Sequence, residues 1–95
     1  MDANLKTVIV SQFKNTQLGF LRIKKNLNIV HFTDDETVNY LRTILSSTPL
    51  EHIDTKGKNY YFKCFEYNAV ITVNSSSFTV ITAKQIKNSQ TFNAT

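Results

Sequence analysis

The segment Thr33–Pro49, TDDETVNYLRTILSSTP, decides the fold because it holds the clearest helix start in the chain and the point where the helical pattern ends. Thr33 and Glu36 have capping-box spacing, in which the threonine hydroxyl accepts from the Glu36 backbone N–H and the carboxylate accepts from the Thr33 N–H. The acidic first turn also complements the positive end of the helix dipole. The pattern predicts a helix that begins after Thr33 and ends before Ser46. Its buried face would consist of Val38, Leu41, Ile44 and Leu45.

Two shorter helices are predicted before this one. Residues 5–13 carry apolar side chains at helical spacing, and Thr16 is a suitable N-cap for a second helix that runs to about Leu27. Gly19 lies inside the second helix, where glycine costs about 1 kcal/mol relative to alanine, so we expect another backbone segment to approach it closely. The apolar positions are Leu5, Val8, Ile9 and Phe13 in the first helix and Phe20, Ile23 and Leu27 in the second.

After Pro49 the pattern changes to short β-prone runs that are separated by turn residues. Helices first and strands second are typical of an α+β fold. We predict about three N-terminal helices packed on one face of a roughly four-stranded antiparallel meander sheet, in a single domain over residues 1–87 with a polar tail at 88–95. The expected strands cover residues 50–53, 60–65, 69–73 and 78–83, with turns at 55–59, 67–68 and 74–77.

The composition is that of one globular domain. Of the 95 residues, 41% are apolar and 19% are charged, which is enough for a single core. The only cysteine, Cys64, excludes an intrachain disulfide, and its apolar context indicates a buried structural thiol in a reducing compartment. The N-terminal residues do not have the pattern of a signal peptide, and the longest uncharged stretch, 67–83, is too polar to span a bilayer. These features predict a cytoplasmic protein with no membrane association.

The sequence offers little for metal or cofactor chemistry. Its two histidines, His31 and His52, and its single cysteine lack metal-ligand spacing, and helix capping explains the acidic run at 34–36. The glycine motifs that bind phosphates and the Gly-x-Ser-x-Gly motif of serine hydrolases are absent from the sequence. We therefore expect no metal and no cofactor.

Cationic side chains gather in two segments, one in the second predicted helix and one beside two tyrosines in the sheet region. Cations interleaved with aromatic side chains can hold phosphates and stack bases. A solvated helix face and a lysine-rich turn would have the same composition. The net charge of +4 gives a mild preference for anionic partners. The candidate nucleic-acid-binding residues are Arg22, Lys24, Lys25, Lys56, Lys58, Tyr60 and Tyr61.

Several blocks of the sequence fall in the order found in one small domain family. They are Leu18-Gly19 and the stretches 22–27 (RIKKNL), 56–61 (KGKNYY), 71–74 (ITVN) and 77–83 (SFTVITA). Together they cover most of residues 14–84 and resemble a small uncharacterised bacterial domain family. The closing strand of that family is similar to the barnase/EndoU/colicin/RelE group of ribonuclease-like folds, in which N-terminal helices pack on a four-stranded antiparallel sheet.

The resemblance implies a metal-independent RNA cleavage, in which a base removes a ribose 2′-hydroxyl proton and cations stabilise the phosphorane. Carried over by position, the residues expected to bind phosphate are Arg22, Lys56 and Lys58. Tyr61 would stack on a base or transfer a proton, and Ser77 and Thr82 would be polar site residues.

The chain departs from this pattern at two histidines. One is replaced by Lys84 and the other is replaced within Lys14-Asn15. Because histidine is the side chain that titrates near neutral pH, the replacements favour binding over catalysis. The candidate catalytic residues are Tyr61, Thr82 and Lys84.

Three classes of function follow from these observations. The main hypothesis is a small basic protein with a ribonuclease-like fold that contacts RNA or an RNA-containing complex without catalysis. A second is a phage-encoded inhibitor of the anti-CRISPR kind, whose partner would be a nucleic-acid-binding host defence protein. The third is a metal-independent endoribonuclease that acts as the toxin of a toxin–antitoxin pair.

Overall fold

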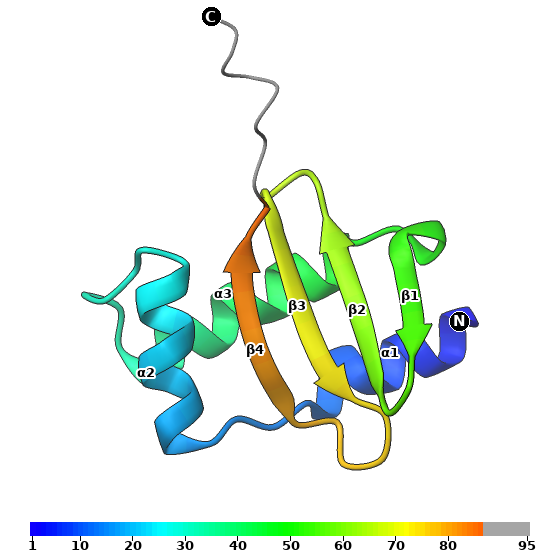
Figure 1. Ribbon diagram of the computed structural model, residues 1–95, viewed down its shortest axis with the longest axis horizontal. Helices are drawn as coiled ribbons and strands as arrows, with labels where there is room; N and C mark the ends of the chain where they lie inside the picture. The colour runs from blue at the N-terminus through cyan, green and yellow to red at the C-terminus, as the bar shows by residue number, and fades with distance from the viewer. Residues whose placement is uncertain (87–95) are drawn as a thin grey trace, which may run out of the picture.

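The computed structural model, which describes residues 1–86, contains three α-helices followed by a four-stranded antiparallel sheet (Figure 1). Its strands follow one another in the order β1-β2-β3-β4, as the predicted meander requires. The α+β prediction is therefore confirmed, whereas the tail predicted at 88–95 and its boundary with the domain lie outside the described residues. The elements are α1 (Ala3–Gln12), α2 (Gln17–Asn26), α3 (Asp34–Ser47), a 3-10 turn η1 (Leu50–His52), β1 (Ile53–Lys56), β2 (Asn59–Cys64), β3 (Ala69–Asn74) and β4 (Val80–Gln85).

Helix α3 begins where the capping box predicts. The Glu36 backbone N–H donates to Thr33 Oγ1 at 3.1 Å, and the Thr33 N–H donates to Glu36 Oε1 at 2.8 Å. The helix continues through Ser46 and Ser47, two residues further than expected. Thr48 at the C-cap donates its hydroxyl to the Ile44 carbonyl at 2.8 Å, and Pro49 follows. Local polar contacts thus define both ends of α3, which contributes more buried apolar side chains than α1 or α2.

One face of the sheet packs against α1 and α3, which lie behind it in Figure 1. On α3 the residues Leu41, Ile44 and Leu45 are fully buried. Phe62 pairs with Ile71 in the β2–β3 register, and both are fully buried as well. The predicted face of α3 is confirmed, since Val38 also packs at its margin. Val8 on α1 was predicted for the buried face but is exposed, because α1 turns Ile9 and not Val8 toward the core.

The link between α1 and α2 passes along the start of β4, and α2 lies beside that strand (Figure 1). The Lys14 N–H donates to the Phe78 carbonyl at 3.0 Å, and the Val80 N–H donates to the Lys14 carbonyl at 2.8 Å. Gly19 is buried, and a Cβ placed there would lie 2.8 Å from Thr16 Oγ1, the hydroxyl that caps α2. The hydroxyl that caps α2 is therefore the group closest to such a Cβ. The nearest backbone atom of another segment, the Val80 carbonyl oxygen, would lie 4.0 Å from it.

The first and last strands begin later than predicted, each for a local reason, and the first strand extends to Lys56, into the turn predicted at 55–59. Residues 50–52 form η1, with the His52 N–H donating to the Pro49 carbonyl at 2.9 Å, so the first strand begins only at Ile53. Phe78 was expected to start the last strand, but its φ of 58° is left-handed and its N–H donates to the Asn74 carbonyl. This turn conformation delays β4 until Val80.

Replacing Leu41 by alanine should lower the free energy of unfolding by about 2–5 kcal/mol, because the side chain is fully buried between α3 and the sheet. Chemical denaturation followed by circular dichroism measures the change. Asn39→Ala, at an exposed position of the same helix, is the control and should stay within about 0.5 kcal/mol of the parent. An unfolding midpoint for Leu41→Ala that matches the control would contradict the assigned packing.

Replacing Thr33 by alanine should cost about 1 kcal/mol, because it removes the acceptor for the Glu36 N–H at the start of α3. Thr33→Ser keeps an acceptor hydroxyl and should retain most of this stability. Equal loss in both variants, measured by urea unfolding, would show that the threonine methyl group matters and not the cap.

Candidate nucleic-acid interface

The second face of the sheet carries mainly polar and charged side chains. Side chains alternate between the two faces along a strand, so the neighbours of the buried Phe62 and Ile71 point away from the helices. The register aligns Asp54, Tyr61, Thr72 and Thr82 in one row across all four strands. A second row contains Lys63, Val70 and Lys84, and a third contains Lys56, Asn59 and Asn74. We call this surface the open face.

A hollow of about 490 Å³ lies on the open face between β2, β3 and β4. Tyr61, Thr82 and Lys84, the three candidate catalytic residues, all line it. A bulge lies on its β4 side: Thr72 pairs with Thr82 but Val73 pairs with Val80, so Ile81 is the extra residue. The structure therefore brings together side chains from three strands that are separated in the sequence. The described lining residues are Asn59, Tyr61, Val70, Thr72, Ile81, Thr82, Lys84, Gln85 and Ile86.

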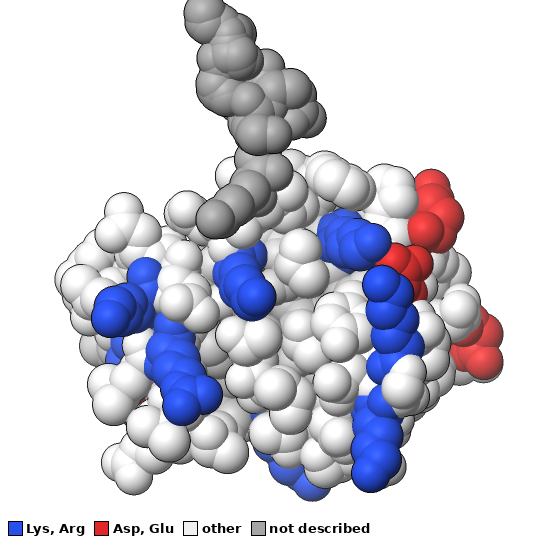
Figure 2. All heavy atoms as spheres, in the orientation of Figure 1, with Lys and Arg blue, Asp and Glu red and all other residues white. Residues whose placement is uncertain are grey.

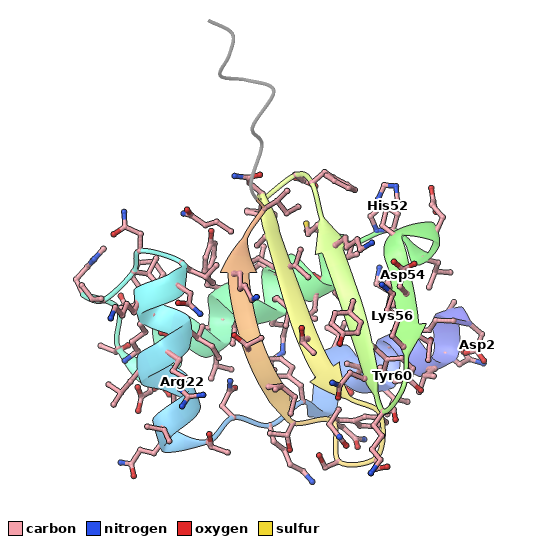
Figure 3. The ribbon with its side chains drawn as sticks, in the orientation of Figure 1. Asp2, Arg22, His52, Asp54, Lys56 and Tyr60 are labelled. Atoms are coloured by element: carbon pink, nitrogen blue, oxygen red, sulfur yellow. The ribbon has the colours of Figure 1, made fainter. Side chains whose placement is uncertain are left out.

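Positive charge is spread across the open face. In Figure 2, which has the orientation of Figure 1, Lys and Arg side chains appear over α2, over β4 and along the β1 side of the sheet, whereas acidic atoms are confined to the β1 edge. Figure 3 shows Arg22 on α2 and Lys56 on β1, on opposite sides of the sheet. Lys58 lies in the turn that joins β1 to β2. An anion that lies across the open face would therefore be close to cations at both edges of the sheet.

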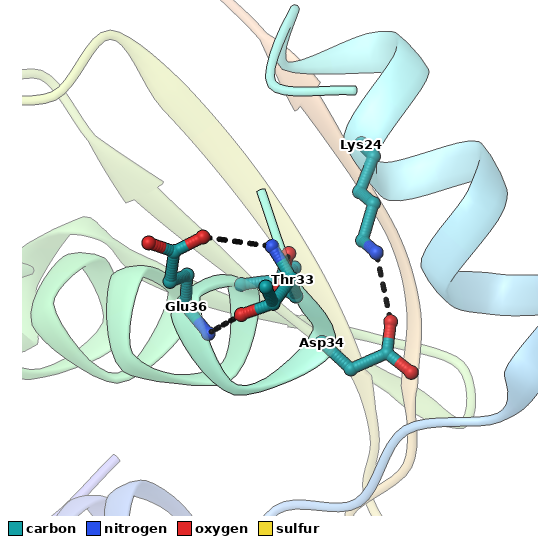
Figure 4. A network of polar contacts seen from close by, with 5 residues as sticks. Lys24, Thr33, Asp34 and Glu36 are labelled. Carbon is teal, nitrogen blue, oxygen red and sulfur yellow. Dashed lines mark hydrogen bonds and ion pairs between the residues drawn. The ribbon is translucent and has the colours of Figure 1, made fainter. Parts of the chain in front are cut away.

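Two of the candidate binding residues lie elsewhere. Tyr60 is on the helix side of the sheet and packs against the core, because it is one residue out of phase with Tyr61. Lys24 forms an ion pair with Asp34 at 2.8 Å (Figure 4), and its side chain is only 14% exposed. Its Nζ also lies 5.8 Å from the centre of the Phe20 ring. Of the candidates on α2, Arg22 and Lys25 are exposed.

Ser77, which the resemblance implied as a site residue, belongs to the turn before β4. Its hydroxyl donates to Thr79 Oγ1 at 2.8 Å, and its N–H donates to Asn74 Oδ1 at 2.9 Å. These contacts hold the turn together, so Ser77 has a structural task at the end of the sheet.

Thr72 and Ile81 also line the hollow but were not predicted as site residues. Thr72 could have been found from the sequence of β3, where it is a polar residue between the apolar Ile71 and Val73, although its own side chain is only 6% exposed. Ile81 could not, because it reaches the hollow through the bulge opposite Thr72 and Val73, and a bulge depends on pairing between strands.

The strongest electrostatic contact on the open face joins β1 and β2. Lys63 Nζ lies 2.7 Å from Asp54 Oδ2, and both side chains are partly exposed. The hydrogen bond and the charge of Lys63 lower the pKa of Asp54 below its ordinary value, with smaller contributions from Lys56 and His52. This pair neutralises Asp54, which shares a row of the sheet with Tyr61. Lys56 and Lys84 form no ion pair among residues 1–86.

Within the part of the chain that the structure describes, no group of three His, Cys, Asp or Glu side chains could hold a metal ion. None of the described helices is both long and apolar enough to cross a membrane. Cys64 is fully buried on β2, on the helix side of the sheet.

Comparison with known proteins identifies the family of the chain. A family model described as a protein of unknown function (DUF3781) matches residues 7–84, which include all of the elements from α2 to β3 and most of α1 and β4. The chain therefore belongs to this family. Searches of curated proteins and of solved structures found no match.

The Asp54–Lys63 pair predicts a pH effect that NMR can measure. Replacing Lys63 by glutamine should raise the pKa of Asp54 toward its ordinary value, because the hydrogen bond and the positive charge are both lost. Since the folded-state pKa lies below that of the unfolded chain, the pair contributes stability above the unfolded pKa and loses it as the pH falls through the folded value. A pH titration of the Asp54 carboxyl carbon, with Lys25→Gln as the control, measures the shift. The same midpoint in both variants would contradict this assignment.

Proposed function

We propose that this member of the DUF3781 family binds single-stranded RNA on the open face of its sheet. The observation that carries the proposal is the row of Tyr61, Thr72 and Thr82 beside Lys84, which combines an aromatic ring, hydroxyl groups and a cation around one hollow. Base stacking on an aromatic side chain and phosphate contacts from cations are the two components of single-strand binding. The protein would act by binding, without catalysis.

Electrostatics support an extended anionic ligand. The chain has a net charge of +4, and its cations lie on both sides of the hollow, with Arg22 on the α2 side and Lys56 on the β1 side. Asp54, the acidic residue in the row that contains Tyr61, forms an ion pair with Lys63. A strand that crosses the sheet could therefore place successive phosphates near cations while one base occupies the hollow.

The form of the site favours unpaired nucleotides. Tyr61 is half-buried in the middle of the sheet, where the rigid strands hold its ring. Bases inside a duplex are already stacked and paired, so only unpaired bases are free to contact an aromatic side chain in a hollow. Threonine hydroxyls and the Asn59 amide add hydrogen-bonding groups for the base or the ribose.

The ribonuclease-like resemblance adds a second candidate function. The gathering of Tyr61, Thr82 and Lys84 at the hollow is the observation that favours it, because these are the three candidate catalytic residues. Helices before a four-stranded antiparallel sheet also agree with that fold group, although one fold serves many functions. Because the chain lacks the two histidines of the pattern, RNA binding is the first proposal and RNA cleavage the second.

Binding can be tested by fluorescence anisotropy with a labelled single-stranded oligoribonucleotide. Affinity should fall with salt, and Lys56→Gln or Lys84→Gln should each reduce the log–log slope by about 0.7, the value for one neutralised phosphate on a single strand. Tyr61→Leu should weaken binding by about 1–3 kcal/mol through loss of stacking and leave the slope nearly unchanged. Lys6→Gln, on α1 in the helix layer, is the matched control and should bind like the parent.

Three outcomes separate the hypotheses. RNA affinity in Lys56→Gln, Lys84→Gln and Tyr61→Leu that equals the affinity of the parent would contradict binding on the open face. No affinity for RNA in the parent would leave a protein partner, such as a nucleic-acid-binding host protein, as the alternative. Cleavage of the same RNA at pH 7 in the presence of a chelator, lost in Lys84→Gln and in Tyr61→Phe, would establish the ribonuclease function.

A further inference from the structure

A second concave surface lies in the helix layer and shares no residue with the open face. It is a groove of about 600 Å³, and the described residues that line it belong to α1, the second half of α3 and η1. Its apolar lining includes Ala3, Val10 and Leu50, of which Val10 and Leu50 are half-buried and pack against the core. The groove thus presents an apolar surface that the fold leaves in contact with solvent.

Two cations project into this groove from fixed positions. Lys6 Nζ donates to the Ser46 carbonyl at 3.0 Å, and Arg42 Nε donates to the Val10 carbonyl at 3.1 Å. The Arg42 guanidinium also lies 4.9 Å from the centre of the Phe13 ring. These contacts hold the charged groups in place but use only some of their N–H donors, since lysine has three and arginine has five.

The two cations act on the same stretch of the groove. Their anchoring positions are four residues apart on both helices, Lys6 and Val10 on α1 and Arg42 and Ser46 on α3, which is about 6 Å along a helix. None of the described lining residues is acidic, and neither cation takes part in an ion pair found among residues 1–86. An anionic group in the groove would therefore be attracted by both cations.

We propose that this groove binds a small amphipathic anion, an alkyl chain that ends in a carboxylate. The head group would accept hydrogen bonds from Lys6 and Arg42, and the chain would cover Val10, Leu50 and Ala3. Charge-assisted hydrogen bonds to an arginine and burial of apolar surface are complementary sources of affinity for such a ligand. The volume lies in the range of about 300–1,000 Å³ that is typical of small-molecule sites.

The distribution of exposed apolar residues favours a small ligand over a protein partner. A stable protein interface buries roughly 800 Å² on each side around an apolar centre. Of the large apolar side chains that are exposed among residues 1–86, only Val8 belongs to α1 or α3. The others lie on α2, on the sheet or in the loops: Leu18, Leu21, Val30, Phe65 and Ile81. The apolar surface here is thus largely limited to the groove.

The experiment is a titration of the full chain with decanoate, below its critical micelle concentration, followed by ¹H–¹⁵N NMR shifts. We expect saturable shifts confined to α1, the second half of α3 and η1. Decanol has the same chain without the charge and should bind at least about tenfold more weakly, the scale of one hydrogen bond to a charged group. Acetate, which carries the head group alone, should give no saturable shifts.

Variants locate the site. Lys6→Gln and Arg42→Lys should each weaken decanoate binding about tenfold, because one loses the charge and the other loses the two-pronged donor. Ala3→Trp keeps both cations and should block the groove by filling it. Lys84→Gln, on the open face, is the matched control and should bind decanoate like the parent.

The proposal is overturned if decanol binds as tightly as decanoate, if the shifts fall on the sheet, or if Ala3→Trp binds like the parent. An NMR spectrum of each variant without ligand reports whether it is folded. Because the groove is separate from the open face, the outcome does not depend on RNA binding.

Discussion

Burial of one face of the sheet against α3 is the constraint on which the rest of the structure depends. Phe62, Ile71 and Val73 on the strands and Leu41 and Leu45 on the helix are fully buried, and each side chain of this size contributes about 1.5–3 kcal/mol when removed from water. The described chain supplies one layer of helices, and that layer covers a single face (Figure 1). The alternate residues of the same strands are consequently left on an uncovered surface, and these form the candidate interface.

At the β4 edge of the sheet, packing determines which side chains reach the candidate interface. An exposed strand edge has unpaired N–H and C=O groups, and the backbone of Lys14 pairs with part of this edge beside Phe78 and Val80. That pairing brings α2 alongside β4. Arg22 therefore lies at the margin of the open face, although it is far from Lys56 and Lys84 in the sequence.

Most of the acidic side chains cap helices or form ion pairs within the fold, and cationic side chains remain in excess. Asp2 caps α1, Glu36 completes the capping box of α3, and Asp34 and Asp54 pair with Lys24 and Lys63. Four of the seven acidic residues thus have local structural partners. Cations that form no ion pair among residues 1–86 line the two concave surfaces, Lys84 the hollow and Lys6 and Arg42 the groove. The net charge of +4 alone does not reveal this division of the cations between two surfaces.

The sequence by itself determined the features that depend on neighbours along the chain. The capping box at Thr33 and the cap at Thr16 rest on contacts within about four residues, and both were predicted. The order of helices and strands and the burial of Leu41, Ile44 and Leu45 on α3 were predicted as well, from the spacing of apolar and turn residues along the chain. The tertiary structure alone decided which cations and rings share a surface. Tyr60 and Tyr61 are the same residue type at adjacent positions, but pairing of β2 with β3 places their side chains on opposite faces of the sheet. Lys24 forms an ion pair with Asp34, ten residues away, and is therefore not part of the candidate interface. The groove and the bulge at Ile81 likewise require segments that are distant in the sequence, because their geometry arises from pairing and packing and not from local preference.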